Sequence, residues 1–373
     1  MTSQPLDFSS LPDLRDLHPG DAAIQNIFLQ RQAISRFTPT SERSYLDDMS
    51  GIDVFICALR HLYSQIPMSW RGDPEKTKPE LRRQIKAAED ENPLLRLAWS
   101  DLGNSTESLL AQSGVRQEIA TRLMERDFGL GNLSFVELAK SDLMCRTLFC
   151  RPPFQLYDGN PLSQPVLTDE PGEWDIETQT DSTEMAKSSM ITWNGEGDLG
   201  TYISDKFGTF VSARNKRRYL FTFNRPVVLR VHYHAPVENS PGFESLRLIN
   251  VDGKCLRRIS NSTSIMEITK PEESITLYTL IAVVRLSKTD ENRDLIRRYG
   301  IDGVECWAPA NFQYTEESWK LGEPGRQYML FYAPALGTPP LVSPPEFTAR
   351  PTDFAANITL ANYIVHGDVE RLQ

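Results

Sequence analysis

The sequence predicts an α+β protein in which a helical half precedes an antiparallel β half. Two observations carry this prediction. Apolar residues recur at helical spacing through most of the first 145 residues, whereas short β-type runs separated by turn residues dominate beyond residue 215. Because helices come first and strands afterwards, instead of alternating, we do not expect a doubly wound parallel sheet.

The composition is that of an ordinary globular protein. The 373 residues are 40% hydrophobic and 24% charged, with a formal net charge of −10. No run approaches the roughly 20 apolar residues of a membrane span, and the N-terminus lacks the basic start and apolar core of a signal peptide. Five scattered cysteines favour a reduced, intracellular protein of the cytoplasm or nucleus. The acidic balance argues against nucleic acid as a partner, and no membrane partner is expected.

Residues 44–67 contain the central predicted helix. We expect Ser50 to be its N-cap, with Asp53 at the third helical position, and Pro67 to end it. Such a cap lies at the positive end of the helix dipole, where a nucleophile would also be stabilised. The residues with helical spacing on one face are Ile52, Phe55, Ile56, Leu59, Leu62 and Tyr63.

The other predicted helices surround this one in the helical half, residues 44–145. Residues 1–43 are expected to lie loosely on the surface, apart from one short helix, and residues 71–79 to form a mobile loop. The predicted helices cover residues 22–35, 79–90, 106–111, 115–124 and 133–140.

Beyond residue 145 the pattern changes. Residues 150–212 are rich in Pro, Asp, Thr and Gly and are expected to be an insertion or linker, partly disordered. Residues 215–335 form the β half, and residues 336–373 a proline-rich tail. The predicted strands cover residues 219–223, 227–233, 245–250, 276–286 and 327–332.

Three blocks, in order, resemble the ubiquitin-specific proteases, the papain-like deubiquitinases. They are MSGIDVFICALRHL at 49–62, RPVVLRVHYHAP at 225–236, and YTLIAVVRLS at 278–287 followed by RRYGIDG at 297–303 and RQYMLFY at 326–332. The resemblance implies a papain-like cysteine protease fold over residues 44–335. In that family a thiolate attacks an isopeptide carbonyl, a histidine takes the proton, and an Asp or Asn orients the histidine.

The catalytic positions depart from the family pattern. The resemblance aligns Ser50 with the nucleophilic cysteine, Arg298 with the histidine and Asn311 with the third residue. An arginine stays protonated and cannot serve as the base. Tyr45 stands at the oxyanion position, and the binding residues implied around the site are Tyr45, Asp48, Tyr299 and Trp307.

No other residues replace this triad convincingly. Cys57 lies among apolar neighbours and is expected to be a buried core cysteine, with His61 packed on the same helix. His232 and His234 share one strand face, but the sequence identifies no further ligands for a metal. The spacing of the cysteines at 145 and 150 does not fit a zinc site. We therefore expect no metal and no cofactor.

The predicted function is that of a pseudoenzyme that binds ubiquitin, a ubiquitin-like protein or another protein partner without efficient isopeptide cleavage. One alternative is an active cysteine deubiquitinase, with Cys57 as a candidate for the nucleophile. The other is a structural scaffold that binds no modifier. An open channel to Ser50 would favour binding of a modifier tail, whereas a cleft filled by the protein's own side chains would favour the scaffold.

Overall fold

A computed structural model describes the helical half, the β half and most of the segment between them. The described residues are 11–32, 43–100, 115, 117–123, 133–166, 174–176, 181–254, 256–258, 265–267, 274–288, 293–306, 319–335 and 346, of which 31–32, 43–49, 256–258 and 265–267 are described by backbone only. The helix expected over residues 106–111 lies outside them.

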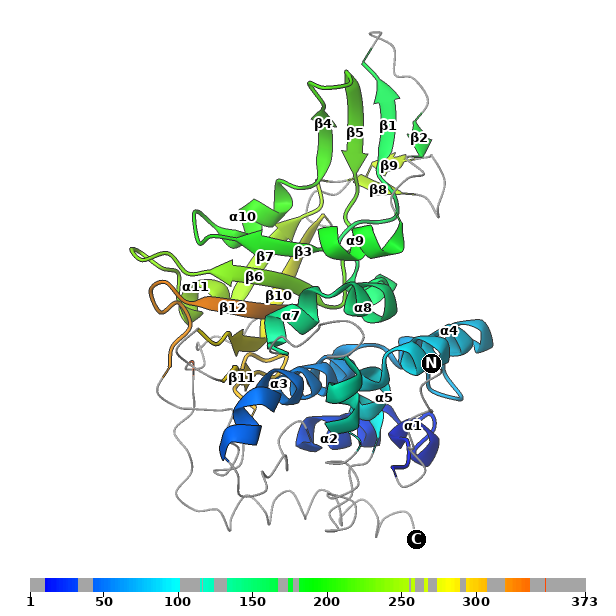
Figure 1. Ribbon diagram of the computed structural model, residues 1–373. Coiled ribbons are helices and arrows are strands. Elements are labelled where there is room, and N and C mark those ends of the chain that lie inside the picture. The colour runs from blue at the N-terminus through cyan, green and yellow to red at the C-terminus, as the bar shows by residue number, and fades with distance from the viewer. Residues whose placement is uncertain are drawn as a thin grey trace.

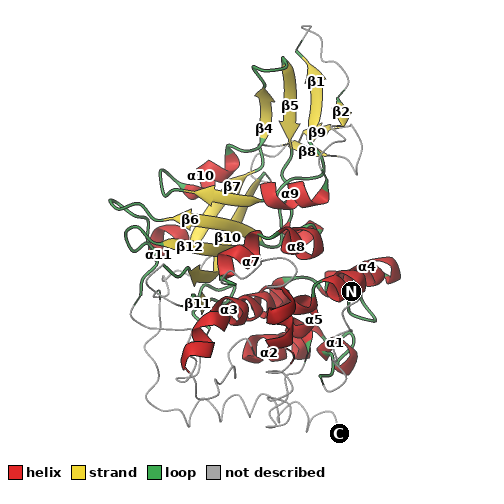
Figure 2. Cartoon of the chain, viewed as in Figure 1, coloured by secondary structure: helices red, strands yellow, loops and turns green. Residues whose placement is uncertain are grey.

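The longest helices gather on one side of a central sheet, and a smaller sheet projects beyond it (Figures 1 and 2). Two short helices, which begin at Leu199 and Phe243, contribute to the core on the other face. This arrangement of mixed helices and sheets agrees with the coarse α+β prediction. The α-helices are α1 (Leu14–Leu17), α2 (Ala22–Gln32), α3 (Arg43–Gln65), α4 (Pro79–Glu91), α5 (Pro93–Trp99), α7 (Phe135–Lys140), α8 (Asp142–Met144), α9 (Ser182–Ser188), α10 (Leu199–Ser204) and α11 (Phe243–Leu246).

The central sheet has six strands in the order β11-β10-β12-β6-β3, with β7 also paired to β10. All its pairs are antiparallel except β3 with β6. The smaller sheet has the order β2-β1-β5-β4, and β8 pairs with β9. The strands are β1 (Leu162–Pro165), β2 (Asp175–Ile176), β3 (Met190–Trp193), β4 (Gly208–Val211), β5 (Arg217–Phe221), β6 (Leu229–His234), β7 (Leu248–Asp252), β8 (Leu256–Arg258), β9 (Ile265–Glu267), β10 (Ile275–Arg285), β11 (Leu295–Arg298) and β12 (Gln327–Pro334).

The central sheet is buried on both faces. In β12, Met329 and Phe331 belong to the core shared with the helical half, while the alternating Tyr328, Leu330 and Tyr332 belong to a second core on the opposite face. Period-two alternation sends successive side chains to opposite faces. A strand that is buried on both faces therefore has a nearly continuous apolar sequence, and β10 and β12 show this pattern.

The apolar stripe predicted on α3 is confirmed. All six of its residues are buried in the first core, where Tyr63 stacks on Trp99 with ring centroids 4.8 Å apart. The helix also ends close to the predicted stop, because Gln65 is its last residue and Pro67 follows.

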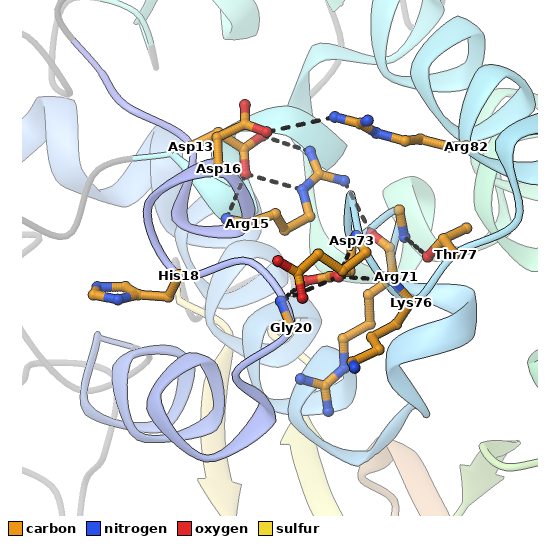
Figure 3. Close-up of polar contacts among 12 residues, drawn as sticks. Asp13, Arg15, Asp16, His18, Gly20, Arg71, Asp73, Lys76, Thr77 and Arg82 are labelled. Atoms are coloured by element: carbon orange, nitrogen blue, oxygen red, sulfur yellow. Dashed lines mark hydrogen bonds and ion pairs between the residues drawn. The ribbon is translucent and has the colours of Figure 1, made fainter.

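The N-terminal region from residue 11 is packed more closely than the sequence predicts. Arg15 of α1 is 5% exposed and donates to both Asp13 and Glu89, the latter on α4, with a shortest Nη1–Oε1 distance of 2.7 Å to Glu89. Figure 3 shows Arg15 with Asp13 and, beside them, Asp73 accepting from the backbone N–H of Gly20. These bonds tie residues 13–20 and 71–79 to the helical half. The described part of the N-terminal segment is therefore not loose, and residues 71–79 are not the mobile loop that we expect from composition.

Residues 150–212 also differ from the linker expectation. They include the helices α9 and α10, most of the smaller sheet, and β3, which pairs in parallel with β6 of the central sheet. Trp193 of β3 is fully buried against Tyr233, with ring centroids 5.0 Å apart. At least the described part of this segment is an integral part of the fold.

Candidate functional site

Ser50 lies inside α3, and the expectation that it caps the helix is wrong. The helix begins at Arg43, so seven residues precede Ser50. Its backbone N–H therefore belongs to the helix interior and is not one of the unsatisfied donors of the first turn. The local stabilisation of an anion by the helix dipole, which acts at the first turn, is consequently absent at Ser50.

The surroundings of Ser50 are closed. Ser50 is only 4% exposed. At the next residue, Gly51, a Cβ would lie 1.8 Å from the carbonyl oxygen of Leu133, so α3 passes directly against the segment that leads into α7. Ser134 then caps α7, with a capping box formed with Glu137. The backbone of this segment, rather than an open cleft, faces α3 at Gly51.

Arg298 lies at the end of β11, where it pairs with Ala282 of β10. Its side chain is 2% exposed, and its Nη1 donates to the carbonyl oxygen of Gln30 at 3.2 Å. Nη2 is buried with no hydrogen-bond partner among the described residues. Burial lowers the pKa of the guanidinium, because a charged group is destabilised away from water.

His61, one helical turn beyond Cys57, lies next to this arginine. Its Nε2 is 3.0 Å from the carbonyl oxygen of Ile281 and 3.1 Å from that of Tyr299. Carbonyl oxygens only accept, so Nε2 carries the hydrogen. Burial, with the charge of Arg298 as a second cause, lowers the pKa of His61 to about 3. His61 is therefore a neutral structural histidine that joins α3 to β10 and to the end of β11.

The predicted burial of Cys57 is confirmed. Its side chain is fully buried in the first core. An apolar environment disfavours the thiolate, which is the nucleophilic form. Nothing in this geometry supports Cys57 as an accessible nucleophile.

The arrangement cannot carry out the thiol protease reaction with the aligned residues. Ser50 and His61 are eleven positions apart on one helix, which corresponds to a rise of roughly 16 Å and is far beyond proton-transfer distance. Arg298 has no lone pair to accept a proton. Arg298 lies beside His61, which is in the last turns of α3, whereas Ser50 is in the first half of the helix.

The remaining aligned residues are placed only in part. Tyr45 and Asp48 lie in the first turns of α3, where the structure describes the backbone alone, and Trp307 and Asn311 lie outside the described residues. Tyr299 is buried; its hydroxyl donates to the carbonyl oxygen of Glu346, and burial raises its pKa.

Glu346 is the residue of this region that the sequence does not single out. It comes from the proline-rich tail, and its carboxylate accepts from Arg297 Nη1 at 3.0 Å and from the backbone N–H of Leu321 at 2.6 Å. In the sequence Glu346 is only a single acidic residue after two prolines. Such a pattern is too common to identify a buried ion pair.

Two surface pockets lie elsewhere. One, of about 470 Å³, is lined mainly by residues of α1 and α4, including Arg15 and Arg82. The other, of about 580 Å³, is lined by Thr192 of β3, by the residues that follow this strand, by Tyr202 of α10 and by His234. Within the part of the chain that the structure describes, no group of three His, Cys, Asp or Glu side chains could hold a metal ion, and no helix is long and apolar enough to cross a membrane.

No protein family and no curated protein matches the sequence. Three solved structures resemble the chain distantly. The apo pseudoubiquitin hydrolase–RNA exonuclease module of Saccharomyces cerevisiae Pan2 has 12% identity and a TM-score of 0.29 over 90% of this chain and 57% of that one. The same module in complex with AACCAA RNA has 11% identity and a TM-score of 0.26, with the same coverage.

A third similar structure is the yeast SAGA DUBm with a mutant Sgf73, at 12% identity and a TM-score of 0.26 over 87% of this chain and 70% of that one. The chain thus spans a little over half the length of the Pan2 module. These weak structural neighbours include ubiquitin hydrolase-like modules, and similarity at this level assigns neither family nor activity.

Proposed function

We propose that the protein is a catalytically inactive relative of the ubiquitin-specific proteases, with a papain-like domain over residues 44–335 and a proline-rich tail. In this proposal it binds ubiquitin, a ubiquitin-like protein or another protein partner inside the cell and does not cleave isopeptide bonds. The ordered sequence blocks at residues 49–62, 225–236 and 278–332 support the family relationship.

One observation carries the loss of activity. At the position aligned with the catalytic base, Arg298 is buried and donates to a backbone carbonyl. A guanidinium at this position has no lone pair with which to deprotonate a nucleophile. The nearest imidazole, His61, has its Nε2 committed to two carbonyl oxygens and a pKa of about 3, which makes it a poor base.

The closed environment of Ser50 further limits the mode of binding. A modifier tail threaded to the catalytic position would need an open path, but Ser50 is buried and Gly51 is in contact with the backbone of Leu133. A closed site favours the scaffold alternative over binding of a modifier tail. In the binding proposal, the partner therefore contacts the outer surface of the protein, and the modifier's C-terminal tail contributes little.

Titration with two forms of ubiquitin tests this proposal. Isotope-labelled ubiquitin and the same protein without its C-terminal tail are each titrated with the full chain and followed by NMR chemical shifts. The expected result is saturable binding of similar strength for both forms. Affinity that depends on the tail would contradict the closed site, and no binding of either form would remove ubiquitin as the partner and favour the scaffold alternative.

A cleavage assay tests the active-enzyme alternative. A fluorogenic amide at the C-terminus of ubiquitin should be released no faster with the protein than without it. Turnover by the wild type that is lost in Ser50→Ala or in Cys57→Ala, in independent preparations of the variant, would show an active site that the sequence alignment has missed. Each variant is first checked for cooperative thermal unfolding, so that loss of activity is not mistaken for loss of fold.

A further inference from the structure

The pocket of about 470 Å³ is lined by residues of α1, of the loop between α3 and α4, of α4 and of α5. Its volume falls within the range of roughly 300 to 1,000 Å³ that is usual for ligand sites. Five cationic and three anionic side chains line it, so the lining carries a net charge of +2, whereas the whole chain carries −10. The five cations are Arg15, Arg82, Arg83, Lys86 and Arg96.

Two of the three pocket carboxylates are already held by Arg15. Its Nη1 donates to Glu89 at 2.7 Å, and its Nη2 donates to Asp13 at 2.6 Å. The guanidinium also lies 4.9 Å from the ring centroid of Trp99. Because Arg15, Asp13 and Glu89 are all buried, this cluster forms a fixed wall of the pocket. The charges that bind a ligand must therefore come from the other cations.

Three of these other cations are exposed. Arg82 pairs with Asp16 at 3.5 Å, beside Arg15 as Figure 3 shows, and the two side chains are 46% and 66% exposed. Arg83 pairs with Glu80, again at the surface. Lys86 is exposed and forms no hydrogen bond or ion pair with any of the described residues. Exposed ion pairs are weak, so the carboxylate of a ligand can take the place of Asp16 or Glu80.

The cations form a row along the pocket. Arg82 and Lys86 are four positions apart on α4, which corresponds to a rise of about 6 Å, and Arg83 lies between them in the sequence. Arg96 adds a further cation from α5. A row of this length matches several carboxylates on one chain, whereas a single phosphate group needs donors that converge on one position.

The loop between α3 and α4 directs its backbone donors inward. The N–H of Gly72 donates to Oγ1 of Thr77 at 3.1 Å. The N–H groups of Glu75 and Lys76 donate to Oδ1 of Asp73 at 2.9 and 3.0 Å. Phosphate-binding turns instead point such N–H groups at the ligand. This loop is therefore not a phosphate-binding turn, and the side chains of α4 and α5 have to supply the contacts to an anion.

The uncharged part of the lining is largely apolar. It includes Ile85, which is only 2% exposed, and Pro74 and Pro79. A side chain that enters the pocket thus meets a hydrocarbon surface bordered by cations. Such a lining suits an apolar side chain with carboxylates on either side, because apolar burial supplies affinity and the ion pairs supply orientation.

We propose that this pocket binds an acidic peptide segment of a protein partner. An apolar side chain of the segment contacts Pro74 and Ile85. Its neighbouring carboxylates pair with Arg83, Lys86 and Arg96. The overall charge of −10 repels such a segment, so its binding depends on the local charge of the pocket.

This inference rests on the proposed function only in assuming a protein partner. It requires neither ubiquitin nor the aligned catalytic positions. The peptide titration described next can fail while labelled ubiquitin still binds, and the reverse, so the two failures are distinguishable.

Fluorescence anisotropy of a labelled Glu-Glu-Leu-Glu-Glu peptide, titrated with the full chain in about 0.1 M salt, tests this site. We expect saturable binding that weakens as the salt is raised to about 1 M, because the screening length falls from about 10 Å to about 3 Å. Lys86→Glu should weaken binding about five- to tenfold, since one ion pair is lost and a repulsion replaces it. Arg218→Glu, which makes the same change in net charge at an exposed residue of β5, should leave the affinity unchanged.

Two further titrations decide the kind of ligand. The peptide Glu-Glu-Ser-Glu-Glu, which lacks the apolar side chain, should bind more weakly. Inorganic phosphate should displace no more peptide than sodium chloride does at the same ionic strength. Circular dichroism of both variants, which change exposed residues only, shows whether the fold is retained.

Four outcomes would each overturn the proposal. They are no binding of the leucine peptide, equal affinities of the two peptides, equal losses in Lys86→Glu and Arg218→Glu, and specific displacement by phosphate. The last result would indicate a site for a small anion instead of a peptide.

Discussion

The buried state of His61 leads to a prediction about acid stability. The pKa of His61 is about 3 in the folded protein, whereas an imidazole in the unfolded chain titrates near 6.5. The unfolded state therefore binds a proton at a higher pH than the folded state does. The stability linked to His61 is complete above about pH 6.5 and is lost progressively as the pH falls toward 3.

The size of this loss follows from the two pKa values. At pH 5 the unfolded imidazole is largely protonated and the folded one is not, so the cost relative to neutral pH is about 2 kcal/mol. Near pH 3 it approaches about 4 to 5 kcal/mol, at 1.36 kcal/mol for each unit of pKa difference. Other groups add their own pH dependence, so the effect of His61 has to be isolated by a variant.

The variant His61→Gln isolates it, because a glutamine amide can donate to the carbonyl oxygens of Ile281 and Tyr299 without titrating. Urea unfolding of wild type and variant is measured at pH 7.5 and pH 5. The wild type should lose about 2 kcal/mol more than the variant between these values. His18→Gln, at a partly exposed histidine, serves as a control that should follow the wild type.

Equal losses in wild type and His61→Gln would refute this reasoning. His61 would then be accessible to protons in the folded protein, and its role as a neutral structural group would be wrong. A base would be available next to Arg298, and the case for an inactive site would be weakened at its most important point.

Two further substitutions test the packing around the aligned catalytic positions. Gly51→Ala should destabilise the protein by about 2 kcal/mol in urea unfolding, although alanine normally favours a helix, because the new Cβ would clash with the carbonyl oxygen of Leu133; an increase in stability would contradict the close approach. Arg298→Met should leave the free energy of unfolding unchanged or raise it by about 1 to 3 kcal/mol, because it removes a buried charge whose Nη2 has no partner among the described residues. A decrease in the free energy of unfolding of more than about 3 kcal/mol would show that the guanidinium is needed for the fold.

The elements with strong periodicity were predictable from the sequence. The apolar stripe of α3 and the continuous apolar runs of β10 and β12 indicated both the type and the approximate bounds of these elements. Because these elements are buried, each has an apolar pattern that can be recognised in its own sequence without knowledge of its partners. The start of α3 was not predictable in this way, because Ser50 fits the local rule for a cap and only the structure shows that the helix continues back to Arg43.

The strand β3 shows why other elements were missed. Its four residues follow a polar segment, and its parallel pairing with β6 depends on partners 40 positions further along the chain. Local composition favoured a linker. Tertiary contacts override such local preferences, since a short strand is stabilised mainly by its neighbours in the sheet.

The aligned positions come from the sequence, but their environment could not be predicted from it. The sequence indicates that an arginine stands where a base is expected, but it does not show that Arg298 is buried or that His61 binds two carbonyl oxygens. Both residues are polar and would ordinarily be assigned to the surface. Their burial depends on the packing of α3 against β10 and β11, which the sequence alone does not reveal.

The central proposal is that the protein does not act as a thiol protease, and ubiquitin with an electrophilic C-terminus tests it most directly. The full chain is incubated with this probe at neutral pH, and intact mass spectrometry followed by peptide mapping identifies any covalent adduct. We predict no adduct at any of the five cysteines. A stoichiometric adduct that maps to Cys57 or to any other single cysteine, and that does not form when the protein is unfolded before the probe is added, would contradict the proposal.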